Sequence, residues 1–419
     1  MLNFETKNFY YAKHKKIRLI DVAKIFCSGY DCFRSWTWPI WFHGACNDLL
    51  IGSGGGSFFF VLSGFILTYN YPKLTSFADV KSFYVARFAR VFPSHIAAML
   101  LLVLFTGGIN QGWLQGGAIV FTGLMHALLL QSLVPLKDVF LTFNGVSWSI
   151  STEMFFYLFF PLLITSIVPG KWMKLVIVSL LVIFHLCFGV LWNVSPDEGG
   201  SQFSLMGLLY INPWVRIFEF YIGVLTCKIY MKTCNTNAVA KLPNSFFSFA
   251  ELMTVMFALF TMWLSPRFTD FVGLGNQVGV VLSYYLSKSG SVFSFAFVIL
   301  IFAYGKGLLH KFLSQKLFIL LGEISFALYL VHMSVLVWFQ KNLTVFSGYS
   351  TTKQAVIFWG ISLLTAWFLH RLIELPCRKL IVDWYKTRTF SYSVFSNSLF
   401  FNALFVIALF SFIKVLAPL

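Results

Sequence analysis

Charged side chains are scarce in this sequence. Only 11% of its 419 residues are Asp, Glu, Lys or Arg, whereas about a quarter are charged in an average soluble domain. Apolar residues make up 58% of the chain, and the mean hydropathy is +0.78. So little charge over so long a chain excludes a soluble globular domain and an intrinsically disordered chain.

Signatures of metal binding and of disulfide scaffolds are also missing. The seven Cys residues show no zinc-ligand spacing, and their odd number argues against a disulfide framework. The sequence contains no Walker A loop, no GxSxG elbow and no HExxH helix. We therefore expect no metal centre and no chemistry that depends on one of these motifs.

Acidic residues are the scarcest charged type, with 15 Asp and Glu against 31 Lys and Arg, and the formal net charge is +16. In a soluble protein this excess favours nucleic-acid binding. In a membrane protein, Lys and Arg gather in cytoplasmic loops and set the orientation of the chain. We adopt the second interpretation and expect no nucleic-acid partner.

Long apolar segments dominate what remains. About ten stretches are close to the roughly 20 residues that span a bilayer. The sequence therefore predicts an all-α polytopic membrane protein with about ten to eleven transmembrane helices, embedded in a lipid bilayer. Segments 114–134 and 277–287 are weaker, and we expect neither to cross completely. A further apolar segment at 398–418 predicts one more span near the C-terminus.

Basic clusters orient the predicted spans. Lys and Arg are concentrated in the tail up to Arg18 and in the loop 71–90, which places both on the cytoplasmic side. We therefore expect an integral protein of the cytoplasmic (inner) membrane, with its N-terminus in the cytoplasm.

Two arginines in this basic region are spaced for joint action. Arg87 and Arg90 stand three residues apart, so on a helix they share one face. Two guanidinium groups on one face suit a bidentate phosphate clamp. Spacing alone favours the simpler interpretation, in which both side chains extend from the membrane toward the cytoplasmic interface.

A second motif precedes an apolar segment and contains Trp148, Ser149, Ser151 and Glu153. A carboxylate at membrane depth is costly, so it indicates a functional site. The alternative is a glutamate that satisfies free N–H groups in the first turn of a helix. The residues alone leave these two interpretations equally open.

Two later motifs have simpler interpretations. Ser325, Tyr329 and His332 recur at helical spacing, which favours an interhelical hydrogen-bonding stripe over a proton relay. Arg371 and Glu374 near the end of a span predict a structural ion pair at the membrane interface.

Five segments, in this order, resemble the acyltransferase-3 family of integral membrane O-acyltransferases. The segments are FFFVLSGFIL (58–67), FYVARFARVFP (83–93), NGVSWSISTEMFFYLFFP (144–161), LGEISFALYLVH (321–332) and RLIELPCRK (371–379). The resemblance covers roughly residues 50–380. It implies an acyltransferase-3-like membrane domain over residues 1–380 and a C-terminal extension, with its apolar span, over residues 381–419.

The resemblance also implies a reaction, namely transfer of an acyl group, with acetyl expected, from acyl-CoA (acetyl-CoA) to a hydroxyl of a carbohydrate or glycan. It assigns Arg87 and Arg90 to the donor. Lys24 is expected to support them from the first span. The motif residues Trp148, Ser149 and Glu153 are expected to form the catalytic centre.

The first span departs from the family pattern, in which Arg or Lys is followed eleven residues later by His, the expected general base. Here Lys24 is followed at that spacing by Ser35, and Arg18 by Gly29. Residues 26–48 also place Asp31 and other polar groups where an apolar helix is expected. A reading-frame shift across this stretch explains the pattern, because a shifted frame can encode an apolar helix with His at position 35. Genuine divergence is the alternative.

Without that His, we expect this exact chain to be weak or inactive as an enzyme. Two other function classes remain open at this point. A glycan or lipid transporter shows inverted repeats, and we find none in the sequence. A catalytically dead binding protein is the third class.

Overall fold

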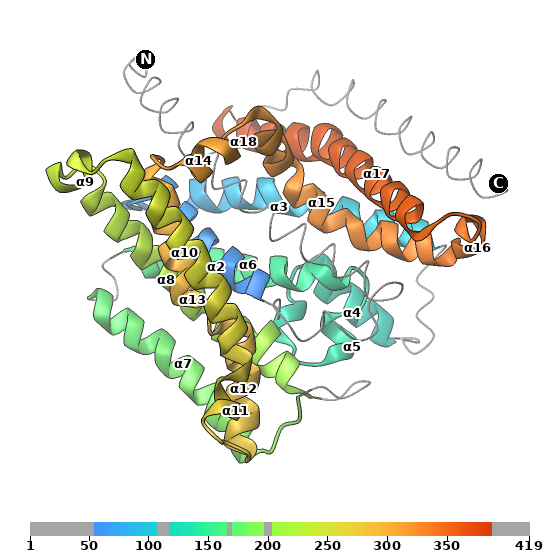
Figure 1. Ribbon diagram of the computed structural model, residues 1–419. Helices are drawn as coiled ribbons and strands as arrows, with labels where there is room; N and C mark the ends of the chain where they lie inside the picture. The colour runs from blue at the N-terminus through green and yellow to red at the C-terminus, as the bar shows by residue number, and fades with distance from the viewer. Residues whose placement is uncertain (1–53, 107–116, 166–169, 197–202, 388–419) are drawn as a thin grey trace.

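The computed structural model describes residues 54–106, 117–165, 170–196 and 203–387 (Figure 1). Within these ranges every element is a helix, apart from one isolated bridge between Leu136 and Phe203. The predicted all-α polytopic fold is therefore confirmed for this part of the chain. Lys24 and the predicted span at 398–418 lie outside the described residues.

The helices include long apolar ones, short connecting ones, and two π-helical segments, η3 and η5. In chain order they are α2 (Gly54–Asn70), α3 (Phe77–Thr106), α4 (Gly117–Ala127), η1 (Gln131–Leu133), α5 (Lys137–Phe140), η2 (Gly145–Ser147), α6 (Trp148–Ile164), α7 (Lys171–Leu191), η3 (Met206–Ile211), α8 (Pro213–Thr233), α9 (Asn237–Lys241), α10 (Asn244–Leu264), η4 (Ser265–Arg267), α11 (Phe268–Phe271), α12 (Gln277–Ser289), α13 (Val292–Tyr304), α14 (Leu308–Leu313), α15 (Lys316–Lys341), α16 (Leu343–Phe346), α17 (Thr351–Leu369), η5 (His370–Glu374) and α18 (Leu375–Thr387).

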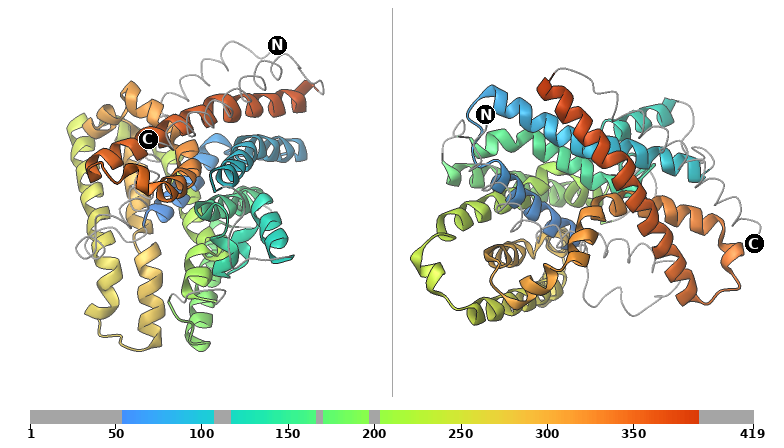
Figure 2. Two further views of the ribbon diagram at one scale, coloured as in Figure 1. Left: turned by 90° about the vertical axis from the view of Figure 1, so that its right-hand side faces the viewer. Right: turned by 90° about the horizontal axis from the view of Figure 1, so that it is seen from above.

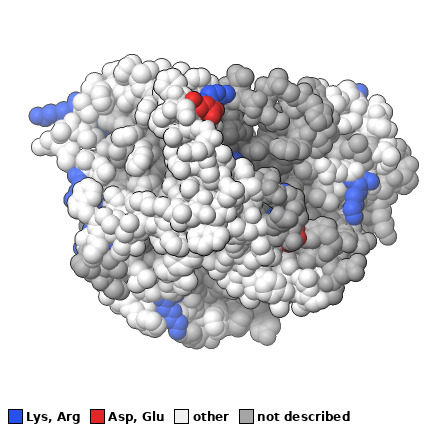
Figure 3. Space-filling view, turned by 90° about the horizontal axis from the view of Figure 1, so that it is seen from below, with Lys and Arg blue, Asp and Glu red and all other residues white. Residues whose placement is uncertain are grey.

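Eight helical stretches in the described ranges are long and apolar enough to cross a membrane. They are Phe77–Phe105, Gly145–Ile164, Lys171–Leu191, Met206–Thr233, Asn244–Phe271, Gln277–Tyr304, Lys316–Lys341 and Thr351–Thr387. On the face shown in Figure 3, charged side chains are few and scattered. This surface suits a hydrocarbon environment, in which charged groups are costly.

The two weak apolar segments, 114–134 and 277–287, differ in the structure. Helix α4 has 11 residues, fewer than the roughly 20 that a span needs, which agrees with the expectation for 114–134. The expectation for 277–287 is wrong, because this segment is the first half of the candidate span Gln277–Tyr304. The break at Gly290 and Ser291 separates α12 from α13 by only two residues, so the two helices form one long stretch.

The long helices form two groups. One contains α7, α8, α10, α12 and α13, and the other contains α3, α15, α17 and α18. The groups run in clearly different directions (Figures 1 and 2). Helix α2 packs mainly on α8 and α13, whereas α6 contacts both α8 and α3. Helix α6, on which α2 also packs, therefore connects the two groups.

Two glycines allow α2 and α8 to approach closely. A Cβ atom at Gly64 would lie 2.0 Å from the carbonyl oxygen of Phe220, and one at Gly223 would lie 1.9 Å from that of Val61. No side chain fits at either distance, so backbone contacts backbone here, as small residues permit between membrane helices. This contact fixes α2 on α8 and leaves another face of α2, with Ser63, to line a cavity.

Candidate functional site

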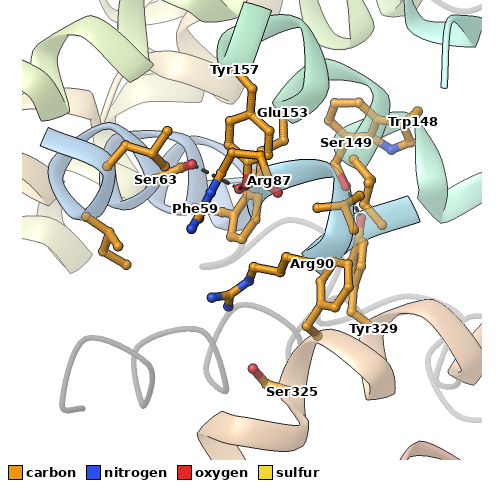
Figure 4. A pocket seen from close by; sticks show the side chains of 16 residues that line it. Phe59, Ser63, Arg87, Arg90, Trp148, Ser149, Glu153, Tyr157, Ser325 and Tyr329 are labelled. Carbon is orange, nitrogen blue, oxygen red and sulfur yellow. Dashed lines mark hydrogen bonds between the residues drawn. The ribbon is translucent and has the colours of Figure 1, made fainter. Parts of the chain in front are cut away.

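The motifs singled out in the sequence converge on one pocket (Figure 4). Its walls come from α2, α3, α6 and α15, and it contains about 860 Å³ of empty space, including its opening. The lining residues are Gly56, Phe59, Ser63, Ile66, Leu67, Arg87, Arg90, Val91, Trp148, Ser149, Ile150, Glu153, Tyr157, Ser325, Phe326 and Tyr329. Residues as far apart in sequence as Gly56 and Tyr329 therefore share one cavity.

The pocket is elongated along α2. The lining positions from Gly56 to Leu67 recur every three or four residues, so they follow one helix face. Eleven residues of helix correspond to about 16 Å. The pocket therefore has a Leu67 end, a middle at Ser63 and a Gly56 end.

Arg87 lies toward the Leu67 end, beside the turn that follows α2. Its Nη2 donates a hydrogen bond of 3.3 Å to the Tyr71 hydroxyl. Its guanidinium carbon lies 5.4 Å from the centroid of the Tyr71 ring and 5.9 Å from that of Tyr157. Within the described residues, the buried Nε atom has no hydrogen-bond partner. The arginine is therefore held by aromatic rings and keeps a donor available.

Arg90 lines the same pocket one helical turn further along α3, as the spacing of the two arginines predicts. If both arginines only extended toward the membrane interface, they would not be expected to line the same cavity. The geometry therefore favours an anion-binding role for the pair, because two guanidinium groups match the oxygens of phosphate groups.

Glu153 stands in the middle of the pocket. Its Oε1 accepts hydrogen bonds from the Ser63 hydroxyl at 3.0 Å and from the Tyr157 hydroxyl at 2.5 Å. No described residue donates a hydrogen bond to Oε2, which belongs to the pocket-lining carboxylate. One oxygen of the carboxylate is therefore fixed, and the other remains available to a ligand.

The alternative role for Glu153 at a helix start is wrong. Helix α6 begins at Trp148, so Glu153 lies beyond its first turn. Both hydrogen bonds to its carboxylate come from side chains, and neither comes from a backbone N–H group. Because the carboxylate lines a cavity, the interpretation as a functional group at membrane depth is the one that fits.

The remaining motif residues on α6 divide into two roles. Ser149 faces the pocket and shares a hydrogen bond of 2.7 Å with the Tyr329 hydroxyl, which also donates to the Val146 carbonyl at 2.9 Å. Ser151 instead bonds to Ser132 at 2.7 Å and lies outside the lining set. Only the first serine of the motif is therefore placed to contact a ligand.

The predicted interhelical stripe on α15 is formed only in part. Tyr329 bonds to Val146 and Ser149, whereas Ser325 and His332 bond to carbonyl groups of their own helix. Ser325 and Tyr329 line the pocket, whereas His332 is fully buried behind them. The Nδ1 atom of His332 lies 2.7 Å from the Tyr329 carbonyl oxygen. A proton relay that reaches the pocket through His332 has no support from this position.

The predicted ion pair between Arg371 and Glu374 is not formed. Glu374 instead bonds to His370, with 2.9 Å between its Oε2 and the histidine Nδ1. Residues 370–374 adopt the wider π-helix η5, in which side chains three residues apart no longer lie directly above one another. His370 therefore has a structural partner in Glu374.

Sequence reasoning gave no role to Ser63 or Tyr157, which hold Glu153 in place. A signal for Tyr157 exists, because it follows Glu153 by four residues and so shares its helix face. Ser63 is the one polar side chain in the apolar segment 58–67, which is the signal that could have marked it. Lys24, expected to assist the arginines, lies outside the described residues. Within the described part of the chain, no group of three His, Cys, Asp or Glu side chains could hold a metal ion.

Comparison with known proteins identifies the family of this chain. The sequence profile of the acyltransferase-3 family, which describes an acyltransferase domain, matches residues 28–371 of this chain. The acyltransferase MdmB of Streptomyces mycarofaciens is 28% identical over 344 residues, which cover 79% of this chain and 82% of that protein. No solved structure matches.

Two further relatives match over about half of their own length. Nodulation protein 10 of Rhizobium leguminosarum bv. viciae is 31% identical over 42% of this chain and 53% of its own. The O-acetyltransferase OatA of Staphylococcus aureus is 24% identical over 77% of this chain and 52% of its own. Together with the family match over residues 28–371, these similarities show that the chain belongs to the acyltransferase-3 family and is an integral membrane O-acyltransferase.

Proposed function

We propose that this protein transfers an acyl group, with acetyl expected, from acyl-CoA to a hydroxyl group of a carbohydrate or glycan. The observation that carries the proposal is the order of groups along one pocket. Arg87 and Arg90 line it together with Glu153, whose free oxygen faces the same space. A phosphate-bearing thioester needs cationic groups that bind its phosphates. An acceptor hydroxyl needs a group that takes up its proton.

The donor chemistry follows from the two arginines. Each guanidinium can form two parallel hydrogen bonds to a phosphate, and charge-assisted bonds of this kind are the strong ones. The phosphates of CoA therefore bind at Arg87 and Arg90. The rest of the donor extends along α2 toward Ser63, which brings the thioester to Glu153.

The acceptor step requires that a hydroxyl lose its proton. In the proposed reaction, Glu153 Oε2 accepts that proton while the acceptor oxygen bonds to the acyl carbon. The carbon–sulfur bond then breaks, and the departing thiolate of CoA takes up a proton. The products are an acylated glycan and free CoA. Ser63 and Tyr157 hold the carboxylate in the orientation that this transfer needs.

The expected inactivity of this exact chain rests on residues 26–48, which lie outside the described part, and it stays a prediction. The acyltransferase-3 resemblance expects the base on the first span. Of the described residues that line the pocket, Glu153 is the one carboxylate, so it supplies a second candidate for the same task.

The proposed placement is the cytoplasmic (inner) membrane, with the N-terminus in the cytoplasm. The basic loop 71–90 supports it, because Lys and Arg favour the cytoplasmic side. This places the Arg87 end of the pocket near the compartment that supplies acyl-CoA.

The test uses the purified protein, expressed with the reading frame across residues 26–48 restored, in lipid nanodiscs with radiolabelled acetyl-CoA and a panel of glycan acceptors. We expect label to move to glycan and free CoA thiol to appear in equal amounts. The variant in which Arg87 and Arg90 are both replaced with Ala should transfer none. Movement of unmodified glycan across vesicles without acylation would instead indicate a transporter.

A further inference from the structure

The Gly56 end of the pocket is aromatic. A Cβ atom built at Gly56 would lie 3.8 Å from the indole ring of Trp148 and 3.9 Å from the Tyr210 hydroxyl. The Trp148 and Tyr210 rings are themselves 4.7 Å apart. Gly56 therefore faces an indole and a phenol hydroxyl, and its missing side chain leaves space in front of them.

Tyr210 is held in place by its backbone. It lies in the π-helix η3, a geometry that is frequent at functional sites. The Arg216 Nε donates a hydrogen bond of 2.7 Å to the Tyr210 carbonyl, and the Thr152 hydroxyl donates one of 3.2 Å to the carbonyl of Ile211. The guanidinium also lies 4.8 Å from the centroid of the Tyr210 ring. Arg216 thus fixes both the ring and the backbone of Tyr210.

Arg216 is itself part of a buried polar cluster. It is fully buried and forms an ion pair with Glu219, which is also buried. Ser57 and Ser289 both donate to Glu219 Oε1, at 3.0 and 2.6 Å. Ionised groups at membrane depth are costly and mark functional regions by default. This cluster lies beside the Gly56 end, because Ser57 follows Gly56 directly.

A second cation, Lys288 in the last turn of α12, lies beside Tyr210. The Lys288 Nζ lies 5.2 Å from the centroid of the Tyr210 ring and 5.3 Å from that of Tyr284. At this end of the pocket Trp148 lines the cavity, and Tyr210 and Lys288, which lie outside the lining set, add a polar and a cationic group directly behind it. Small-molecule sites have this composition, in which apolar walls give area and a few polar groups give orientation.

The position of this end also matters for the reaction. Gly56 and Ser63 are seven residues apart on α2, which corresponds to roughly 10 Å of helix. The arginines lie toward the opposite end, past Glu153. A donor that binds at the arginines and presents its thioester at Glu153 leaves the Gly56 end free for the second substrate.

We propose that the acceptor binds at the Gly56 end of the pocket, with a sugar ring against Trp148 and its hydroxyl groups near Tyr210 and Lys288. This inference rests on the proposed function and names the acceptor subsite within it. The C–H groups of a sugar ring complement the negative face of an indole, while its hydroxyls need polar partners. Arg216 is a positioning residue that acts through Tyr210.

The test measures sugar binding without any donor, so that it does not depend on acyl transfer. Methyl β-D-glucopyranoside is the probe, and mannitol is the control, because mannitol carries hydroxyls but has no ring face. Saturation-transfer difference NMR on the full chain in nanodiscs reports binding of each. We expect binding of the glucoside at least tenfold tighter than binding of mannitol.

Two substitutions at one position locate the site. Gly56→Leu should weaken glucoside binding at least tenfold, because its side chain fills the space before Trp148. Gly56→Ala should bind as the wild type does, since contacts of 3.8 and 3.9 Å are ordinary. Affinity for CoA, measured on the same samples, should be unchanged in both variants, which also shows that they fold.

Three results would overturn the proposal. These are full glucoside binding by Gly56→Leu, equal loss of CoA and glucoside binding, and no preference for the glucoside over mannitol in the wild type. Tyr210→Phe gives an independent check, because loss of the hydroxyl alone should weaken glucoside binding by at least threefold. An absence of acyl transfer together with intact glucoside binding would contradict the proposed reaction and leave the sugar subsite standing.

Discussion

Ser63 on α2 and Glu153 on α6 are ninety residues apart in sequence and are joined by a hydrogen bond of 3.0 Å. The same carboxylate oxygen accepts a hydrogen bond from the Tyr157 hydroxyl, and the centroid of the Tyr157 ring lies 5.9 Å from the Arg87 guanidinium carbon. The proposed donor clamp and the proposed base are therefore linked through one tyrosine.

Loss of one pocket arginine should weaken binding of CoA selectively. Arg87→Gln removes a charged donor, and hydrogen bonds to charged groups contribute about 1.5–3 kcal/mol, which is roughly 10- to 150-fold in affinity. Isothermal titration of CoA in nanodiscs measures this change. Pantetheine, which lacks the phosphates, should bind both forms equally.

Lys81→Gln is the matched control for that experiment. Lys81 is exposed, lies on the same helix α3 and does not line the pocket, so this variant loses the same charge elsewhere. CoA affinity in this control should stay within about twofold of the wild type. An equal loss in both variants would mean that net charge, and not the pocket, governs donor binding.

The contact between α2 and α8 should not tolerate added side chains. Gly64→Ala places a methyl group 2.0 Å from the Phe220 carbonyl oxygen, so the helices must separate. Overpacking of this kind costs about 1–3 kcal/mol or more. The thermal unfolding midpoint in nanodiscs should fall. Gly360→Ala on α17 has open space around it and should be neutral or slightly stabilising. Equal midpoints for the two variants would contradict the close packing.

The first span can be tested on the gene itself. A frame shift across residues 26–48 predicts an inserted or deleted base near codon 26 and a compensating one near codon 48. It also predicts the triplet CAT across the boundary of codons 35 and 36, which places His eleven residues after Lys24. Nucleotide sequencing of codons 20–55 gives the answer. An intact frame would show that the divergence is genuine and would leave Glu153 as the candidate base.

The sequence predicts the helical class and most of the pocket walls, because these depend on local patterns. Long apolar segments indicate membrane helices, and the i, i+3 spacing of Arg87 and Arg90 places both on one face of α3. The pairing of Ser149 with Tyr329 and of Ser63 with Glu153 depends on how separate helices pack. That information is not local, so sequence spacing alone could not predict it.

Two predictions from the sequence, for segment 277–287 and for the pair Arg371 and Glu374, were wrong for local structural reasons. The Gly290–Ser291 break between α12 and α13 is typical of a helix end, yet the two helices continue as one candidate span. The pairing of Arg371 with Glu374 assumed a regular α-helix. The π-helix at 370–374 shifts the side-chain positions, so that Glu374 pairs with His370.

The most direct test of the account is the effect of Glu153→Gln on acetyl transfer by the protein expressed from its own gene. Removal of a general base typically lowers the rate by about 10²- to 10⁴-fold. We therefore predict that acetyl-CoA consumption and acylated glycan both fall at least 100-fold, while CoA affinity is unchanged. A variant that transfers acetyl groups at close to the wild-type rate would contradict the account.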